Sequence, residues 1–186
     1  MKPHDEIRSL LQAFQDGYTH RDLTKLDAFM ELFTPEAELI GTNGVRPGAQ
    51  EWYRSRDTAR RMIEGDWEFW GDLRLDLEST SIQVEGEAGW ISVFATVSKV
   101  IGEEEYASFL DSIRKYLDES SLPAEQKLHY ILRGGTNTVY EMHRGEQFTW
   151  PLRLTAAVVH RPNGWKFAQM HFSYATVHFP DVRLGV

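Results

Sequence analysis

A histidine near the end of the chain has the side chain best suited to carry out chemistry. His171 lies in an aromatic run, and imidazole can act as an acid, a base or a hydrogen-bond donor near neutral pH. Ser173 follows two residues later, and the sequence offers no base that would activate its hydroxyl as a nucleophile. We predict His171 as a catalytic residue and Ser173 as a ligand contact. The alternative for His171 is a structural role within a sheet or at a subunit interface.

Two further polar residues precede His171 on a neighbouring run. Arg153 and Thr155 alternate with apolar residues, so we expect both on one face of a strand, with Thr155 near His171. A buried arginine can hold a carboxylate through two hydrogen bonds; its alternative is an ion pair with one of the 28 acidic residues. Aromatic side chains are predicted to form the mouth of the same pocket, although core packing accounts equally well for some of them: Tyr18, Trp52, Trp67 and Trp70.

The sequence lacks the residues that several other kinds of functional site require. The 186-residue sequence contains no cysteine, which excludes disulfides and thiolate chemistry. Paired histidines with a carboxylate at metal-binding spacing and glycine-rich phosphate motifs do not occur, so we predict no metal and no cofactor. The net charge of −8 argues against nucleic-acid binding. The N-terminal residues lack an apolar run of signal or membrane length, so we expect a cytoplasmic protein without a membrane partner.

The elements that must position these residues begin with a hairpin at the end of the chain. Two strand-like runs, 152–161 and 165–176, flank the turn sequence Arg-Pro-Asn-Gly at 161–164. Strict alternation would place Trp165, Phe167, His171 and Ser173 on one face of the second run.

Helical and strand periodicity alternate along the rest of the chain. Helices are predicted over 5–16 (ending at Gly17), 22–32 and 49–64, and strands over 38–42, 73–77, 81–85 and 90–100. Residues 101–148 interrupt this order with two amphipathic helices, 103–116 and 121–133, and then a hairpin or loop over 137–148. We predict an α+β protein of one domain over 1–186, in which 101–148 is an insertion between sheet strands.

Two stretches resemble a known family. HRDLTKLDAFMELFTPEAELIGTNG near the start and LRLTAAVVHRPNGWKFAQMHFS near the end are similar to the opening and closing of SnoaL-like proteins, members of the nuclear transport factor 2-like superfamily. The resemblance covers 5–100 and 149–176. It implies a cone, in which a strongly curved antiparallel sheet wraps N-terminal helices around a cavity, and it implies a homodimer.

The resemblance includes steroid isomerases of the same superfamily, whose catalytic residues have no match here. Gly41 stands where the resemblance places a catalytic aspartate, and Phe14 where it places a tyrosine. Proton abstraction beside a carbonyl needs such a base and donor, so that reaction is not supported. We predict a protein that binds a small, largely apolar ligand in the cone. The alternatives are a lyase, isomerase or cyclase acting on a polyketide- or steroid-like substrate with His171 as acid/base, and an oligomeric assembly module.

Overall fold

The computed structural model describes most of the chain, in two compact units. Described are residues 2–42, 44, 46–49, 51–100, 102–132 and 147–174, with only the backbone at 69, 99, 100, 103, 105, 109, 147–150 and 174. The first unit comprises Met1–Val97 and Trp150–Thr176, and the second comprises Ser98–Thr149 and Val177–Val186. The second unit therefore begins close to the start of the predicted insertion. The prediction of one domain over 1–186 stays a prediction.

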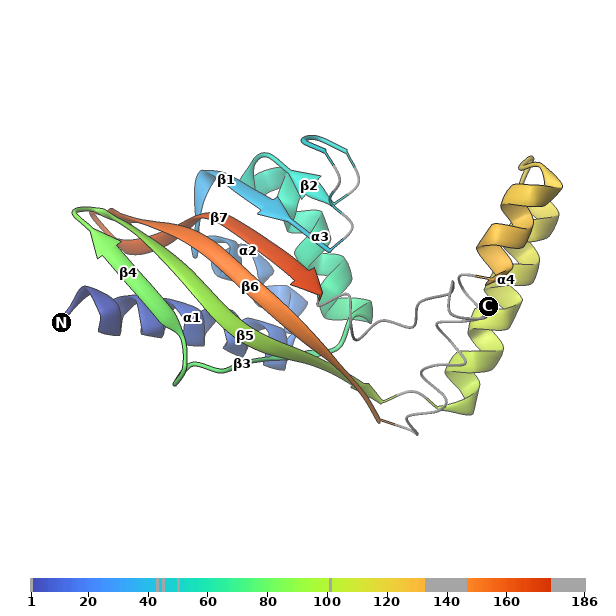
Figure 1. Ribbon diagram of the computed structural model, residues 1–186, viewed down its shortest axis with the longest axis horizontal. Helices are drawn as coiled ribbons and strands as arrows, with labels where there is room; N and C mark the ends of the chain where they lie inside the picture. The colour runs from blue at the N-terminus through green and yellow to red at the C-terminus, as the bar shows by residue number, and fades with distance from the viewer. Residues whose placement is uncertain are drawn as a thin grey trace, which may run out of the picture. The chain divides into compact units, whose positions relative to one another are not determined.

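The described strands form one mixed, curved sheet (Figure 1). Its order is β2-β1-β7-β6-β5-β3, and β4 pairs with β5 outside this path. The pairs β1–β2, β4–β5 and β6–β7 are antiparallel, whereas β1 and β7 run parallel. The strands are, in chain order, β1 (Phe33–Ile40), β2 (Trp52–Tyr53), β3 (Asp72–Leu75), β4 (Ser81–Glu85), β5 (Ala88–Val100), β6 (Gln147–Arg161) and β7 (Gly164–Tyr174).

Helices of the first unit gather on one face of this sheet (Figure 1). They are α1 (Pro3–His20), the short 3₁₀ helix η1 (Leu23–Lys25), α2 (Leu26–Met30) and α3 (Arg56–Phe69). Their apolar sides and the inward side chains of the strands share one hydrophobic core. We call the sheet face toward the helices the inner face and the opposite one the outer face. The predicted fold class, a curved sheet wrapped around N-terminal helices, is confirmed.

The hairpin at the end of the chain is present, with one irregularity that changes its faces. β6 and β7 join at the predicted turn, where Gly164 has a φ of 103°. Ala157 pairs with Gln169, but Val158 pairs with Phe167, so Ala168 is an extra residue in β7. Such a bulge shifts the alternation by one residue. Phe167 is consequently buried on the inner face while His171 is exposed on the outer face, and the prediction that they share a face was wrong.

The first helix continues beyond its predicted end. Gly17 lies inside α1, which ends at His20, where Arg21 takes the left-handed conformation with a φ of 48°. A side chain at Gly17 would collide with the ring of Phe29, because a Cβ there would lie 2.3 Å from that ring. The glycine therefore permits close packing between α1 and α2, and the prediction that it stops the helix was wrong.

The third helix begins later than the sequence predicted and ends later. Ser55 is its N-cap, and its hydroxyl accepts a hydrogen bond from the backbone N–H of Thr58 at 3.2 Å. Trp52 and Tyr53, which were expected inside the helix, instead form β2, which pairs with β1. Gly65 lies within α3 and does not end it. The segment predicted as one helix over 22–32 forms η1 and the short α2, which ends at Met30.

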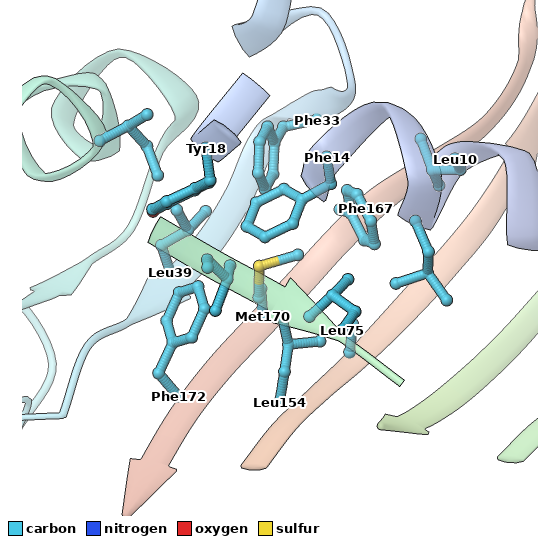
Figure 2. Packing of buried hydrophobic residues seen from close by; sticks show 14 of the residues in the cluster. Leu10, Phe14, Tyr18, Phe33, Leu39, Leu75, Leu154, Phe167, Met170 and Phe172 are labelled. Atoms are coloured by element: carbon cyan, nitrogen blue, oxygen red, sulfur yellow. The ribbon is translucent and has the colours of Figure 1, made fainter. Parts of the chain in front are cut away.

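The core of the first unit is built around the aromatic ring of Phe14 (Figure 2). Phe14 is fully buried on α1, and its ring lies 5.0 Å from that of Tyr18 and 5.7 Å from that of Phe167 between centroids. Phe172 from β7 lies on another side of it, at 6.2 Å. Phe14 thus serves packing at the position where the resemblance suggested a catalytic tyrosine.

The second unit contains the predicted amphipathic helices. α4 spans Glu103–Glu119, and residues 124–132 are helical as well. The hairpin or loop predicted over 137–148 lies largely outside the described residues. None of the helices in the described residues has the length and apolar character needed to cross a bilayer.

Candidate functional site

A hydrogen-bonded pair of polar side chains joins α1 to α3. The hydroxyl of Tyr18 donates a hydrogen bond to the Asp66 carboxylate, with 2.7 Å between Oη and Oδ2. Tyr18 is fully buried, whereas Asp66 is half-buried. A carboxyl held this way in an apolar surrounding is a group that can exchange protons with a bound molecule.

Burial changes the acidity of both partners. The pKa of Asp66 is raised from 3.8 to about 7, mainly because desolvation penalises the carboxylate. The hydrogen bond from Tyr18 acts in the opposite direction, and the nearby charge of Glu51 raises the pKa further. The pKa of Tyr18 is raised well above its usual value by burial and by the charge of Asp66. Tyr18 therefore stays a hydrogen-bond donor at neutral pH, while Asp66 exists both with and without its proton.

A second carboxylate lies beside the glycine that replaces the expected aspartate. The backbone N–H of Gly41 donates to the carbonyl oxygen of Glu51 at 2.8 Å. A Cβ on Gly41 would lie 2.4 Å from Oε2 of Glu51, so the Glu51 side chain occupies the space that a larger residue would need. The segment just before β2 thus supplies an acidic group next to the position where the resemblance suggested one on β1.

Aromatic side chains surround the Tyr18–Asp66 pair. The ring of Tyr18 lies 6.1 Å from that of Trp70 and 6.4 Å from that of Trp67, both near the end of α3. Trp70 also contacts Phe172, at 5.8 Å. Trp70 is half-buried and packs against the edge of the core. The structure therefore brings together three of the aromatic residues predicted to line a pocket.

The fourth predicted aromatic residue lies apart from this group. Trp52 is in β2, and its indole N–H lies near the carboxylate of Glu38. This contact and a hydrogen bond from Gln169, at 2.7 Å, lower the pKa of Glu38. Trp52 and Tyr53 border a pocket of about 520 Å³ at the start of α3. None of the contacts described for Trp52 joins it to Tyr18.

The polar residues predicted around His171 lie together on the outer face. Thr155 is the direct partner of His171 across β6 and β7, and Arg153 is the partner of Ser173. His171, Thr155 and Arg153 are exposed, and Ser173 is half-buried. The predicted proximity of Thr155 and His171 is confirmed. The strand itself separates this group from the inner face, where Phe172 and the Tyr18–Asp66 pair lie. The roles predicted for these four residues stay predictions.

Sequence reasoning missed Asp66, although the helix pattern contains a signal for it. The buried side of α3 repeats at helical spacing through Ala59, Ile63 and Trp67, and Asp66 falls on the same stripe. A carboxylate on an apolar stripe is costly unless it has a partner or a function. The signal was lost because the helix was predicted to end at residue 64. Within the described residues, no three histidine or acidic side chains are grouped to hold a metal ion.

The chain has the cone-shaped, cystatin-like fold of nuclear transport factor 2-like proteins. A protein of this kind from Novosphingobium aromaticivorans superposes with a TM-score of 0.59 at 11% identity, covering 98% of this chain and 87% of that one. A Salmonella enterica superfamily member gives 0.56 at 14% identity, covering 93% and 91%. A candidate dehydratase from Streptomyces avermitilis gives 0.57 at 13% identity, covering 94% and 99%. At these identities the likeness concerns the fold alone.

Within this superfamily the sequence identifies a narrower group. The model of the SnoaL-like domain matches residues 7–120, more than half of the chain. The chain therefore belongs to the SnoaL-like domain family. No curated protein matches its sequence.

Proposed function

We propose that this protein binds a small, largely apolar molecule beside Asp66 and uses the Asp66 carboxyl to move a proton on it. The observation that carries the proposal is the hydrogen bond from the buried Tyr18 to the half-buried Asp66, beside aromatic rings. Lyases and isomerases need a group that takes a proton from one atom and returns it to another. The fold is shared with a candidate dehydratase, whose reaction would belong to this class.

The two residues of the pair have different roles in this proposal. Asp66, with a pKa of about 7, can accept a proton from a substrate carbon or deliver one to a leaving group at neutral pH. Tyr18 orients the carboxyl and stabilises its charged form through the 2.7 Å hydrogen bond. Trp70, which is half-buried, supplies apolar surface against which a hydrocarbon body can pack. In this proposal the catalytic residue is Asp66, and Tyr18 is a positioning residue.

Proton transfer by Asp66 can be tested on the ligand that the protein itself carries. Native mass spectrometry of protein purified without added ligand is expected to show a bound small molecule. Incubation in D₂O should then place deuterium on a carbon of that molecule, read by mass spectrometry after extraction. The Asp66→Asn variant should incorporate deuterium at least about 100-fold more slowly, because the base is lost.

Two further variants decide whether Asp66 or His171 is the acid/base. Glu68→Gln, on the exposed side of α3, is the matched control and should exchange like the wild type. If His171→Ala stops the exchange and Asp66→Asn does not, His171 is the acid/base and the assignment to Asp66 fails. A protein that carries no small molecule at all contradicts the proposed ligand binding.

A second proposal concerns the outer face of the sheet, which we propose as the contact of a homodimer. Trp90 and Phe94 of β5 are 47% and 51% exposed there and give this face two large aromatic side chains that a partner could cover. Isologous contact between two copies would cover both residues. His171 and Thr155 lie on the same face, so a structural role for His171 at an interface is compatible with this proposal.

Changing these two residues to acids is expected to dissociate the dimer. A Trp90→Glu, Phe94→Glu double variant should sediment as a monomer in analytical ultracentrifugation, because the new like charges of both copies would meet at the interface. Leu128→Glu, which alters an equally exposed leucine in the second unit, is the control and should leave the dimer intact. A wild-type monomer at micromolar concentration would contradict the proposal.

A further inference from the structure

The pocket at the start of α3 combines an aromatic wall with cationic side chains. Its volume is about 520 Å³, in the range of small-molecule sites. Trp52 and Tyr53 of β2 line it, and both are half-buried, so part of each side chain stays accessible. Arg54 and Arg61 line the same pocket and are exposed. The pocket therefore offers apolar surface and positive charge to one bound molecule.

The other arginines near the start of α3 are neutralised by acidic side chains. Arg56 pairs with Glu31 at 2.8 Å, and Arg60 pairs with Asp27 at 2.9 Å, between guanidinium nitrogen and carboxylate oxygen. Arg61, in contrast, has no ion pair within the part of the chain that the structure describes. The sequence has 28 acidic and 20 basic residues, so acidic partners are plentiful. A guanidinium group left without one can bind the anionic group of a ligand.

Arg54 acts on the Glu38 carboxylate without forming an ion pair with it. The pKa of Glu38 is lowered mainly by Trp52 and Gln169, and the charge of Arg54 adds a smaller effect in the same direction. Among the described residues, no carboxylate oxygen lies within ion-pair distance of Arg54. Its guanidinium group can therefore donate hydrogen bonds to a ligand as well.

The charge of the lining decides which anion fits. The lining contains two arginines and one acidic residue, Asp57, which gives a net charge of +1. The start of α3 adds a partial positive charge to this. A singly charged anion matches this balance, whereas a dianion would bring a second negative charge close to Asp57. Among singly charged groups, a carboxylate suits arginine well, because a guanidinium group can hold it through two parallel hydrogen bonds.

We infer that this pocket binds a small aromatic molecule that carries one carboxylate. The ring system packs on the aromatic side chains of β2, and the carboxylate binds the guanidinium groups of Arg54 and Arg61. The inference goes beyond the proposed function and does not depend on it, because the lining includes neither Tyr18 nor Asp66.

Three probes that share one ring system test this assignment: 2-naphthoate, 2-naphthamide and 2-naphthyl phosphate. Each is titrated into ¹⁵N-labelled protein at pH 7.5, and the indole N–H resonance of Trp52, assigned with Trp52→Phe, is followed by NMR. Naphthoate should give a saturable shift and bind about tenfold more tightly than the uncharged naphthamide, the effect of one charge-assisted hydrogen bond. Naphthyl phosphate should bind no more tightly than naphthoate, because its second charge is opposed by Asp57.

Variants of the arginines complete the test. Arg54→Gln and Arg61→Gln should each weaken naphthoate binding about tenfold and leave naphthamide binding unchanged. The double variant should bind naphthoate and naphthamide equally. Arg60→Gln is the matched control, since it removes a positive charge from the same helix at an arginine that already has acidic partners. It should bind naphthoate like the wild type.

Three results would each overturn the inference. In the first, the wild-type protein binds naphthoate no more tightly than naphthamide. In the second, Arg60→Gln weakens naphthoate binding as much as Arg61→Gln, which would mean that the overall charge of the helix acts rather than the pocket. In the third, naphthyl phosphate binds more than tenfold more tightly than naphthoate, which would exclude a singly charged ligand.

Discussion

An Asp66→Asn variant is expected to be more stable than the wild-type protein above neutral pH and no more stable near pH 4. The pKa of Asp66 is about 7 in the folded protein, against 3.8 for an unperturbed aspartate. Between these values the folded state binds more protons than the unfolded state, so the free energy of unfolding falls as the pH rises from about 4 to about 7. The total loss is on the order of 4 kcal/mol, at about 1.4 kcal/mol for each pH unit.

Asparagine removes this loss because it does not ionise, and its side-chain oxygen can still accept the hydrogen bond from Tyr18. Urea denaturation at several pH values measures the difference in unfolding free energy between variant and wild type. Glu68→Gln, on the same helix but exposed, should show no such rise in stability between about pH 4 and pH 8. An Asp66→Asn advantage that does not change with pH would show that burial does not raise this pKa.

A residue that lowers the stability of its own protein at neutral pH calls for an explanation other than packing. Groups that need a shifted pKa for their reaction are found where burial and neighbouring charges cost stability. Asp66 meets both conditions, since desolvation and Glu51 act on it in the same direction. The stability measurement therefore tests whether the pKa of Asp66 is raised, and the deuterium-exchange experiment tests whether Asp66 transfers a proton to a ligand.

The fold was predictable because its signals are local and repeated. The turn at 161–164, the alternation through β4 and β5 and the apolar stripe of α1 each depend on a few neighbouring residues. The two stretches that resemble SnoaL-like proteins then identified the family. The ends of helices were less predictable, because packing against other elements decides where they stop.

The candidate site depended on features that the sequence does not display. The bulge at Ala168 reverses the faces of β7, and no residue type nearby marks it. His171 was therefore predicted with the inward aromatic residues, although it is exposed on the outer face. Asp66 was missed because the predicted α3 ended two residues before it. The rings of Tyr18, Trp67 and Trp70 lie together, while their predicted role at the mouth of a pocket stays a prediction, and the hydrogen bond of Tyr18 to Asp66 could be found only from the packing of α1 on α3.

The second large effect is a change in the free energy of unfolding when glycine is replaced by alanine at two helical positions. One of these positions is crowded and the other is open. Alanine is favoured over glycine in a helix by about 1 kcal/mol, so each Gly→Ala change would stabilise the protein if propensity alone decided. A Cβ at Gly65 of α3 would meet no atom within 4 Å, and Gly65→Ala should therefore stabilise the protein by up to about 1 kcal/mol. At Gly17 the added carbon would lie 2.3 Å from the ring of Phe29.

The ring of Phe29 packs against four other aromatic rings, which limit its movement on the side of the core. Trp67 lies 4.9 Å from it and Phe14 5.5 Å between centroids, and Tyr18 and Phe33 each lie at 6.1 Å. Overpacking of such a core costs about 1–3 kcal/mol or more, so Gly17→Ala should lower the free energy of unfolding by about 2 kcal/mol despite its better helix propensity. Thermal and urea denaturation of the two variants, measured side by side, should give shifts of opposite sign. Equal stabilisation by both changes would mean that α1 and α2 do not pack this closely, and that Gly17 is not the residue that lets them approach.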